Sequence, residues 1–191
     1  MDNFLLRAIV LLALPTLVLP GGVYVMAKLS GQAEVTQRLL DHAQPEDRKG
    51  LGLRLFGYDL EAVSRRWAAL DPDTRKLERR ALELDLVFPF LYGGALAAAL
   101  LLAWAALDRP FRPVWLILPV AITVIADWIE NLIQLGQLRL FDASAHAALR
   151  SGWIQIASVA TTTKLFFYSG SSLLLIGLVA WIVVCGLARR S

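Results

Sequence analysis

The sequence predicts an all-α protein, a four-helix transmembrane bundle with extramembrane amphipathic helices between spans 1 and 2. Hydrophobic residues make up 57% of the 191 residues, whereas a typical soluble domain contains about 45–50%. The excess lies in four runs of roughly 20 residues, which is the length that an α-helix needs to cross a bilayer. Residues 1–191 are therefore expected to form a single integral membrane domain.

The expected spans follow the apolar runs in order. They cover residues 8–27, 86–107, 113–135 and 165–187. A cleaved signal peptide is the alternative for the first run, because Arg7 precedes it. That run is longer than the usual apolar core of a signal peptide, and no clear small-residue cleavage site follows it. We therefore expect it to be an uncleaved span.

The connection 28–82 is expected to form an amphipathic cap on the outer membrane surface. Within it, segments 33–43 and 58–70 place apolar residues at helical spacing, so each predicts a short amphipathic helix. The segment 139–155 has a similar pattern and is expected to behave in the same way.

A further helix is expected to begin just before the second span. Asp71 is suited to the N-cap, and Pro72 is suited to the first helical position. Because apolar residues follow without a loop signal, this helix is expected to run unbroken into span 86–107.

Basic residues in short segments next to the spans predict the orientation. These residues are Arg7, Arg109, Arg112, Arg189 and Arg190. Positive charge in short loops favours the cytoplasmic side. The chain is thus expected to be a multi-pass protein of the bacterial inner membrane with both termini in the cytoplasm. The basic stretch 75–80 favours the opposite orientation, because it lies close to the second span.

The third span carries polar residues where lipid contact would require apolar ones. Asp127, Glu130, Asn131 and Gln134 follow the spacing i, i+3, i+4, i+7, so they share one helix face. Charged groups inside a membrane cost a few kcal/mol or more, and they usually face a bundle interior or a wet cavity. This face predicts a buried polar cluster.

The other spans are expected to bring polar groups to the same outer end. They contribute Tyr24 and Lys28 from the first span, Asp85, Pro89 and Tyr92 from the second, and Thr161, Lys164 and Tyr168 from the fourth. Lys164 is expected within a few ångströms of Asp127 or Glu130, because all three share the same depth. Asp127 and Glu130 are the candidate catalytic residues. The candidate binding residues are Asp85, Tyr92, Asn131, Lys164 and Tyr168.

Two alternatives to a catalytic site remain open for these residues. The cluster could be a purely structural ion-pair network. A hard cation held by Asp85, Asp127 and Glu130 is weakly supported by their oxygen ligands. His42 and His146 have no ligand spacing around them, so no metal or cofactor is expected.

The stretches DLVFPFLYG and ADWIENL, followed by a lysine at the start of the last span, resemble a known pattern. They are similar to an uncharacterised family of small bacterial four-span membrane proteins. The residues that match are Tyr58, Asp85, Phe88, Pro89, Tyr92, Asp127, Glu130, Asn131 and Lys164. The resemblance covers residues 55–170 and implies a shared polar site, but it implies no particular reaction.

Three functions fit these observations. The first is a membrane protein whose polar pocket near the outer leaflet binds a lipid or small apolar molecule, with acid–base chemistry at Asp127 or Glu130. The second is an accessory or assembly subunit of a membrane complex, and the third, less favoured, is a proton-coupled carrier. The expected partners are membrane lipids, a lipid-like ligand, and a membrane protein or second copy. The net charge of +3 is too small to indicate nucleic acid.

Overall fold

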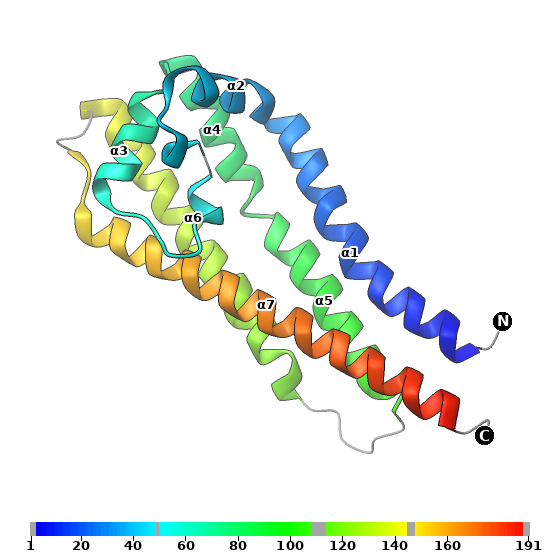
Figure 1. Cartoon of the computed structure of the whole chain (residues 1–191). Helices are drawn as coiled ribbons and strands as arrows, with labels where there is room; N and C mark the ends of the chain where they lie inside the picture. Colours follow the sequence, from blue (N-terminus) through cyan, green and yellow to red (C-terminus); the bar gives the residue numbers. More distant parts are fainter. Residues whose placement is uncertain (1–2, 49, 108–113, 145–147, 189–191) are drawn as a thin grey trace.

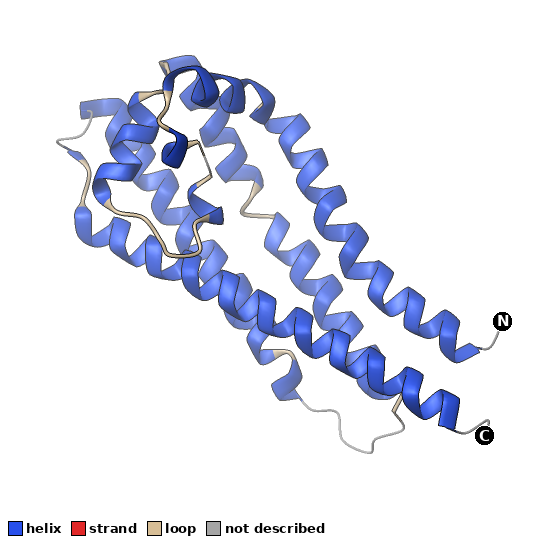
Figure 2. Ribbon diagram, in the orientation of Figure 1, coloured by secondary structure: helices blue, strands red, loops and turns tan. Residues whose placement is uncertain are grey.

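The computed structural model describes residues 3–48, 50–107, 114–144 and 148–188. These residues are mostly helical and contain no strand, which confirms the all-α prediction (Figure 2). Long helices lie side by side, and the start of the first and the end of the last lie at the same end of the bundle (Figure 1). Short helices gather at the opposite end.

The elements follow one another along the chain with short connections. They are α1 (Asn3–Ser30), α2 (Gln32–His42), η1 (Pro45–Asp47), η2 (Leu51–Leu53), α3 (Leu60–Ala68), α4 (Pro72–Leu84), α5 (Phe88–Ala105), η3 (Val114–Leu116), α6 (Leu118–Ser144) and α7 (Ser151–Ala188).

Four helical segments in the described residues are long and apolar enough to cross a membrane. They are Ile9–Ser30, Pro72–Ala105, Leu118–Ser144 and Ser151–Cys185. These segments identify a multi-pass membrane protein.

The third and fourth spans differ in their bounds from the expected ones, and one prediction, for the segment between them, is wrong. The expected start of the third span at 113 lies outside the described residues, and the helix itself begins at Leu118. The segment 139–155 is not a separate surface helix. It comprises the end of α6 and the start of α7 with the connection between them, because both helices continue past their expected ends.

The end of the bundle that holds the start of α1 is packed with apolar side chains. Residues from α1, α5, α6 and α7 form this core, which is Leu11, Leu96, Ala99, Leu100, Ala103, Val120, Leu175, Val179 and Ile182. The alanines on α5 allow neighbouring helices to approach closely.

Gly93 allows α5 to approach α6 closely. A Cβ atom added to Gly93 would lie 2.5 Å from Cγ2 of Val124, whereas one added to Gly94 would meet nothing within 4 Å. Gly93→Ala is therefore expected to lower the free energy of unfolding by about 1–3 kcal/mol through overpacking. Gly94→Ala is the matched control, and its higher helix propensity should leave the protein unchanged or slightly more stable. Equal stability of the two variants, measured by denaturant unfolding in micelles, would contradict this packing.

The helix from Pro72 does not run unbroken into the second span, as the sequence had suggested. Asp71 caps α4 by accepting a hydrogen bond from the amide of Thr74 at 2.8 Å, as predicted. However, α4 ends at Leu84 and α5 begins only at Phe88. Pro89 has no N–H to donate to the carbonyl of Asp85, four residues earlier.

Side chains of α6 satisfy the carbonyls that this break exposes. Trp128 Nε1 donates to the carbonyl of Leu86 at 2.9 Å, and Asn131 Nδ2 donates to the carbonyl of Asp85 at 3.2 Å. Since buried carbonyls without partners are costly, these two bonds fix the break against α6. They also fix the position of the Asp85 side chain.

The amphipathic helices pack onto the polar end of the bundle, as predicted for the cap. Gly31, with φ of 74°, lets the chain turn sharply from α1 into α2. The apolar faces of α2 and α3 then meet the end of α6 and the start of α7 in a second core. Its buried residues are Val35, Leu39, Leu51, Tyr58, Ala62, Val63, Trp67, Leu70, Leu138, Phe141, Leu149, Ile154 and Ala157.

Ion pairs connect the pieces of the cap. Arg66 of α3 donates to Glu78 of α4 through two nitrogens, at 3.2 and 3.0 Å. Asp47 is buried and pairs with Arg65 at 2.8 Å and with Arg54 at 3.3 Å. Burial alone would raise the pKa of Asp47, but hydrogen bonds from these two arginines lower it below its usual range. Asp47 therefore holds the loop 44–57 to α3 as a charged group.

Candidate functional site

Lys164 of α7 lies between the two carboxylates of α6 that the sequence placed on one face. Its Nζ is 2.8 Å from Oδ1 of Asp127 and 2.6 Å from Oε2 of Glu130. The prediction that Lys164 pairs with one of them is confirmed, and the structure pairs it with both. Because all three side chains are largely buried, removing Lys164 would leave two carboxylates without a counter-charge in an apolar setting.

Asp127 is held by groups from three helices. Besides Lys164, it accepts a hydrogen bond from the Tyr92 hydroxyl on α5 at 2.7 Å, and Asn131 Nδ2 lies 3.4 Å from its Oδ1. Only 3% of its surface is exposed. With its oxygens occupied in this way, Asp127 fixes the positions of Lys164 and Tyr92.

Glu130 connects the cluster to the cap. Its Oε1 accepts from Gln134 Nε2 at 2.8 Å, and the same Nε2 also donates to the Tyr58 hydroxyl at 2.9 Å. Burial and the negative charge of Glu130 raise the pKa of Tyr58 to about 12, so the phenol is neutral at physiological pH. A neutral phenol here adds no further charge to the cluster.

The cluster contains more acidic than basic groups. Asp85 accepts a hydrogen bond from Asn131 Nδ2 at 3.1 Å on Oδ2, and the same Nδ2 lies 3.4 Å from Oδ1 of Asp127. The hydrogen-bonded cluster thus contains three carboxyl groups and one lysine amine, and the amine contacts two of the three carboxyl groups. If all three were ionised, the site would carry two uncompensated negative charges, which is costly in a low-dielectric environment. The arrangement favours a bound proton or a ligand that donates hydrogen bonds.

The η2 turn covers the Lys164–Glu130 pair from the cap side. A Cβ atom added to Gly52 would lie 3.1 Å from Oε1 of Glu130 and 3.3 Å from Nζ of Lys164. The following segment is attached to α7, because the amide of Tyr58 donates to Ser158 Oγ at 2.8 Å. A side chain at position 52 would therefore fit only tightly against the ion pair, and the glycine lets the backbone of η2 approach the pair without displacing it.

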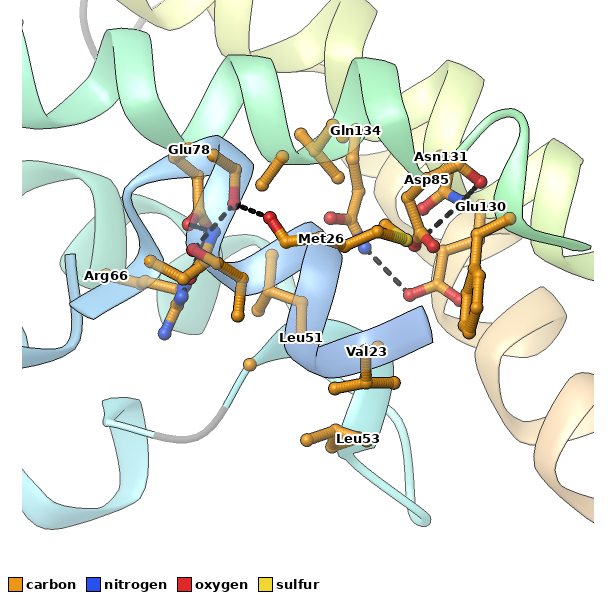
Figure 3. A pocket seen from close by; sticks show the side chains of 18 residues that line it. Val23, Met26, Leu51, Leu53, Arg66, Glu78, Asp85, Glu130, Asn131 and Gln134 are labelled. Carbon is orange, nitrogen blue, oxygen red and sulfur yellow. Dashed lines mark hydrogen bonds and ion pairs between the residues drawn. The ribbon is translucent and has the colours of Figure 1, made fainter. Parts of the chain in front are cut away.

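A cavity of about 280 Å³ adjoins this cluster, between α1, α4, α6 and η2. Figure 3 shows two polar regions in its wall, with the Arg66–Glu78 pair on one side and Asp85, Asn131 and Glu130 on the other. Apolar side chains lie between and below them, among them Val23, Met26, Leu51 and Leu53. Phe88 also lines the cavity. A cavity with this lining suits an amphipathic molecule.

The candidate site residues differ in their relation to the cavity. Glu130, Asp85 and Asn131 line it. Asp127, Tyr92 and Lys164 belong to the hydrogen-bonded cluster but are not among the residues that line the cavity. Tyr168 meets the cluster through its ring, whose centroid lies 5.8 Å from that of Tyr92.

Tyr24 and Lys28, the polar residues expected from the first span, do not take part in the cluster. Tyr24 and Lys28 are exposed, and neither of them lines the polar cavity. Ser30 lines the cavity instead, although its hydroxyl donates to the carbonyl of Met26 at 2.7 Å. The prediction that Tyr24 and Lys28 lie at the polar end of the bundle is confirmed, since the adjacent Val23, Met26 and Ala27 line the polar cavity, but neither residue joins the cluster.

Several cavity and cluster residues were not predicted as site residues. Gln134 lay on the predicted polar stripe, and its spacing could have added it to the binding set. Gly52 and the Arg66–Glu78 pair lie in the cap, and the helical pattern of the cap shows no sign that they face the cavity.

Within the described residues, no group of three or more His, Cys, Asp or Glu side chains is placed to hold a metal ion. His42 is exposed on α2, and His146 lies outside the described part of the chain. The acidic residues of the cluster are instead engaged by Lys164, Tyr92, Asn131 and Gln134.

The fold and the cluster together define a multi-pass helical membrane protein with a capped polar site at one end of its bundle. No protein-family model, curated protein or solved structure matches the chain. The resemblance to small bacterial four-span proteins therefore stays a prediction.

Proposed function

We propose that this protein binds an amphiphile, a lipid or small apolar molecule with a hydrogen-bond-donating head, in the pocket beneath its cap. The observation that supports this most directly is the position of Glu130. It is fully buried within the chain, pairs with Lys164, and still lines a cavity of about 280 Å³. Asp85 and Asn131 would receive the head beside it.

The proposal includes acid–base chemistry, with Glu130 as the group that exchanges a proton with the bound molecule. Geometry favours Glu130 over Asp127, because only Glu130 of the two lines the cavity. Asp127 is then a positioning residue that holds Lys164 against Glu130. A carboxylate that accepts a proton and returns it elsewhere on the same molecule needs no other co-reactant.

The proposed setting is the bacterial inner membrane, with both termini cytoplasmic and the pocket in the outer leaflet. Short basic segments near the ends of the first and last spans support this orientation. The beginning of α1 and the end of α7 lie at the same end of the bundle, opposite the cap.

The two alternatives receive less support. An exposed apolar surface on α2 and α3 would have favoured an accessory subunit that docks a partner there, but the apolar faces of these helices are buried in the cap core. A proton carrier needs a polar route through the inner half, where the buried cluster is formed by apolar side chains.

Glu130→Gln is expected to keep the fold and lose the bound amphiphile. The amide is nearly isosteric, and Asp127 still pairs with Lys164 at 2.8 Å. Native mass spectrometry of protein released from micelles would measure the bound mass, with Glu83→Gln on the exposed side of α4 as the matched control. A bound mass that persists in Glu130→Gln, or a wild type that carries none after mild extraction, would remove the proposal.

A further inference from the structure

The end of the η2 turn and the residues after it expose three large apolar side chains. Leu53 is 73% exposed, Leu55 is 54% exposed and Phe56 is 97% exposed. Exposed apolar side chains that gather in one place mark a surface that meets a partner or a membrane. This segment is fixed against α7, because the amide of Tyr58 donates to Ser158 Oγ at 2.8 Å. We call Leu53, Leu55 and Phe56 the exposed apolar loop.

The exposed apolar loop lies beside the membrane-spanning part of α7. Thr162 Oγ1 of α7 is 3.3 Å from the carbonyl oxygen of Leu55. Phe166, one turn beyond Thr162 on the side away from the cap, is exposed. Both positions belong to the candidate span Ser151–Cys185. The loop is therefore next to a surface that faces hydrocarbon when the bundle is in a membrane.

Two exposed residues of α1 mark the membrane boundary at the same end of the bundle. Tyr24 and Lys28 are both exposed, and they follow a surface of mainly apolar side chains that begins at Ile9. Tyrosine is enriched where a membrane meets water, and a lysine side chain near a helix end reaches outward to the same layer. These two residues indicate that α1 crosses the head-group layer between Tyr24 and Lys28.

The polar pocket opens at this level, between α1 and the exposed apolar loop. Among the described residues that line the pocket, only Val23 and Leu53 are exposed. Figure 3 shows their side chains on the same side of the pocket. Val23 immediately precedes Tyr24, so it lies on the hydrocarbon side of the boundary. Two apolar side chains thus form the mouth of a pocket whose interior is polar.

From this arrangement we propose that the pocket opens sideways into the leaflet at the cap end of the bundle and takes only the head of a bilayer lipid. The exposed apolar loop inserts among the acyl chains beside this opening. The inference rests on the proposed function and narrows its ligand to a molecule that resides in the bilayer and keeps its hydrocarbon chain among the lipids.

Two observations support a lipid as the partner of this surface. The cavity of about 280 Å³ is smaller than the roughly 300–1,000 Å³ of pockets that enclose a whole drug-sized ligand. A long hydrocarbon chain must therefore remain outside it. The mouth is also continuous with the candidate spans, because Val23 belongs to the span Ile9–Ser30. This continuity favours acyl chains over a second protein at the exposed apolar loop.

Electron paramagnetic resonance of spin-labelled variants can test whether the loop lies in the membrane. Cys185→Ser removes the single cysteine, and Leu55→Cys and Phe56→Cys then each carry one nitroxide label in phosphatidylcholine nanodiscs. Both labels are expected to collide more with oxygen, which concentrates in the bilayer, than with a water-soluble nickel chelate. Asp41→Cys, on the exposed side of α2, is the control and should show the reverse. Loop labels that behave like this control would overturn the membrane contact.

Photolabelling can test the sideways opening. The two probes are hexadecylamine with a diazirine at carbon 3 and hexadecylamine with a diazirine at carbon 16, in the same nanodiscs. The carbon-3 probe is expected to label mainly residues 23–27 and 51–53. The carbon-16 probe should label the lipid-facing surface without concentrating on these segments. Equal concentration of both probes there would mean that the whole molecule is enclosed, which would contradict the opening.

Leu53→Trp should narrow the mouth and reduce labelling by the carbon-3 probe several-fold. Leu55→Trp is the matched control, because Leu55 is exposed on the same loop but does not line the pocket. It should leave the labelling unchanged. Equal labelling of the two variants would show that the probe does not pass between α1 and the loop.

Glu130→Gln separates this inference from the proposed function. Suppose that Glu130→Gln loses both the bound mass and the carbon-3 labelling, whereas Leu53→Trp and Leu55→Trp label alike. The pocket would then stand and the sideways opening would fail. A wild type without bound mass, together with unchanged labelling in Glu130→Gln, would overturn both.

Discussion

Lys164→Met is expected to lower the free energy of unfolding by about 3–5 kcal/mol, the usual cost of breaking a buried ion pair from one side. The methionine is similar in length but leaves Asp127 and Glu130 without the amine that lies 2.8 and 2.6 Å from them. Denaturant unfolding in mixed micelles, followed by circular dichroism, would measure the loss.

Two further variants make this result specific to the cluster. Lys76→Met removes an exposed lysine that pairs with Asp73, and it should leave the stability close to that of wild type. Adding Asp127→Asn to Lys164→Met should restore part of the stability, because one of the two unpaired carboxylates is then neutral. If the single Lys164→Met variant were as stable as wild type, the ion pair would contribute nothing to folding, and Lys164 would act as an interface anchor.

Trp67→Ala is expected to destabilise the cap by about 3–5 kcal/mol, as is typical for truncation of a buried large aromatic residue. Trp67 is 1% exposed and packs edge-on against Phe141 of α6 with ring centroids 5.8 Å apart. Proteolysis within 59–70 in native membranes should be slow in wild type and much faster in the variant.

Trp153→Ala provides the control for this experiment. Trp153 lies at the start of α7 and is 49% exposed, so its removal should leave cleavage within 59–70 slow. Rapid cleavage of the wild-type cap would contradict the packing of α3 against the bundle. Equal cleavage of the two tryptophan variants would show that Trp67 does not hold the cap in place.

The sequence could predict the ion-pair cluster because helical spacing fixes which residues share a face. Asp127 and Glu130 were one turn apart on α6, and Lys164 lay at a similar depth on another span. The contact of Lys164 with these carboxylates was therefore predictable from the number and order of the spans. The cap followed in the same way, since the apolar positions of α2 and α3 had to be buried somewhere.

Other features depended on information that helical spacing does not contain. Helical spacing assigned Tyr24 and Lys28 to the polar end of the bundle, but it does not fix the rotation of α1 about its axis, which turns both residues to the exposed side. The choice between Asp127 and Glu130 as the pocket residue depends on where the cavity lies, and both share the same stripe. The three-residue η2 turn is too short to show a helical pattern of apolar residues, so the sequence did not indicate that Gly52 would lie against the ion pair.

The break before α5 could be predicted from the sequence only in part. Pro89 was visible in the sequence and was known to remove a backbone hydrogen bond. What the sequence could not show was that Trp128 and Asn131 would accommodate the break by donating to the carbonyls of Leu86 and Asp85. A continuous helix was predicted because these compensating partners are about forty residues away in the chain, as the separations of 42 and 46 show.

The Lys164–Asp127 pair has a consequence for biosynthesis, because 37 residues separate the two partners in the chain. The ribosome therefore delivers the carboxylates of α6 to the translocon before it has made the amine that neutralises them. An aspartate at the centre of a lone helix disfavours release into lipid by about 2.5–3.5 kcal/mol. We therefore expect α6 and α7 to enter the bilayer together as a hairpin rather than one after the other. The amine of Lys164 on α7 would then neutralise part of the negative charge of α6 during insertion.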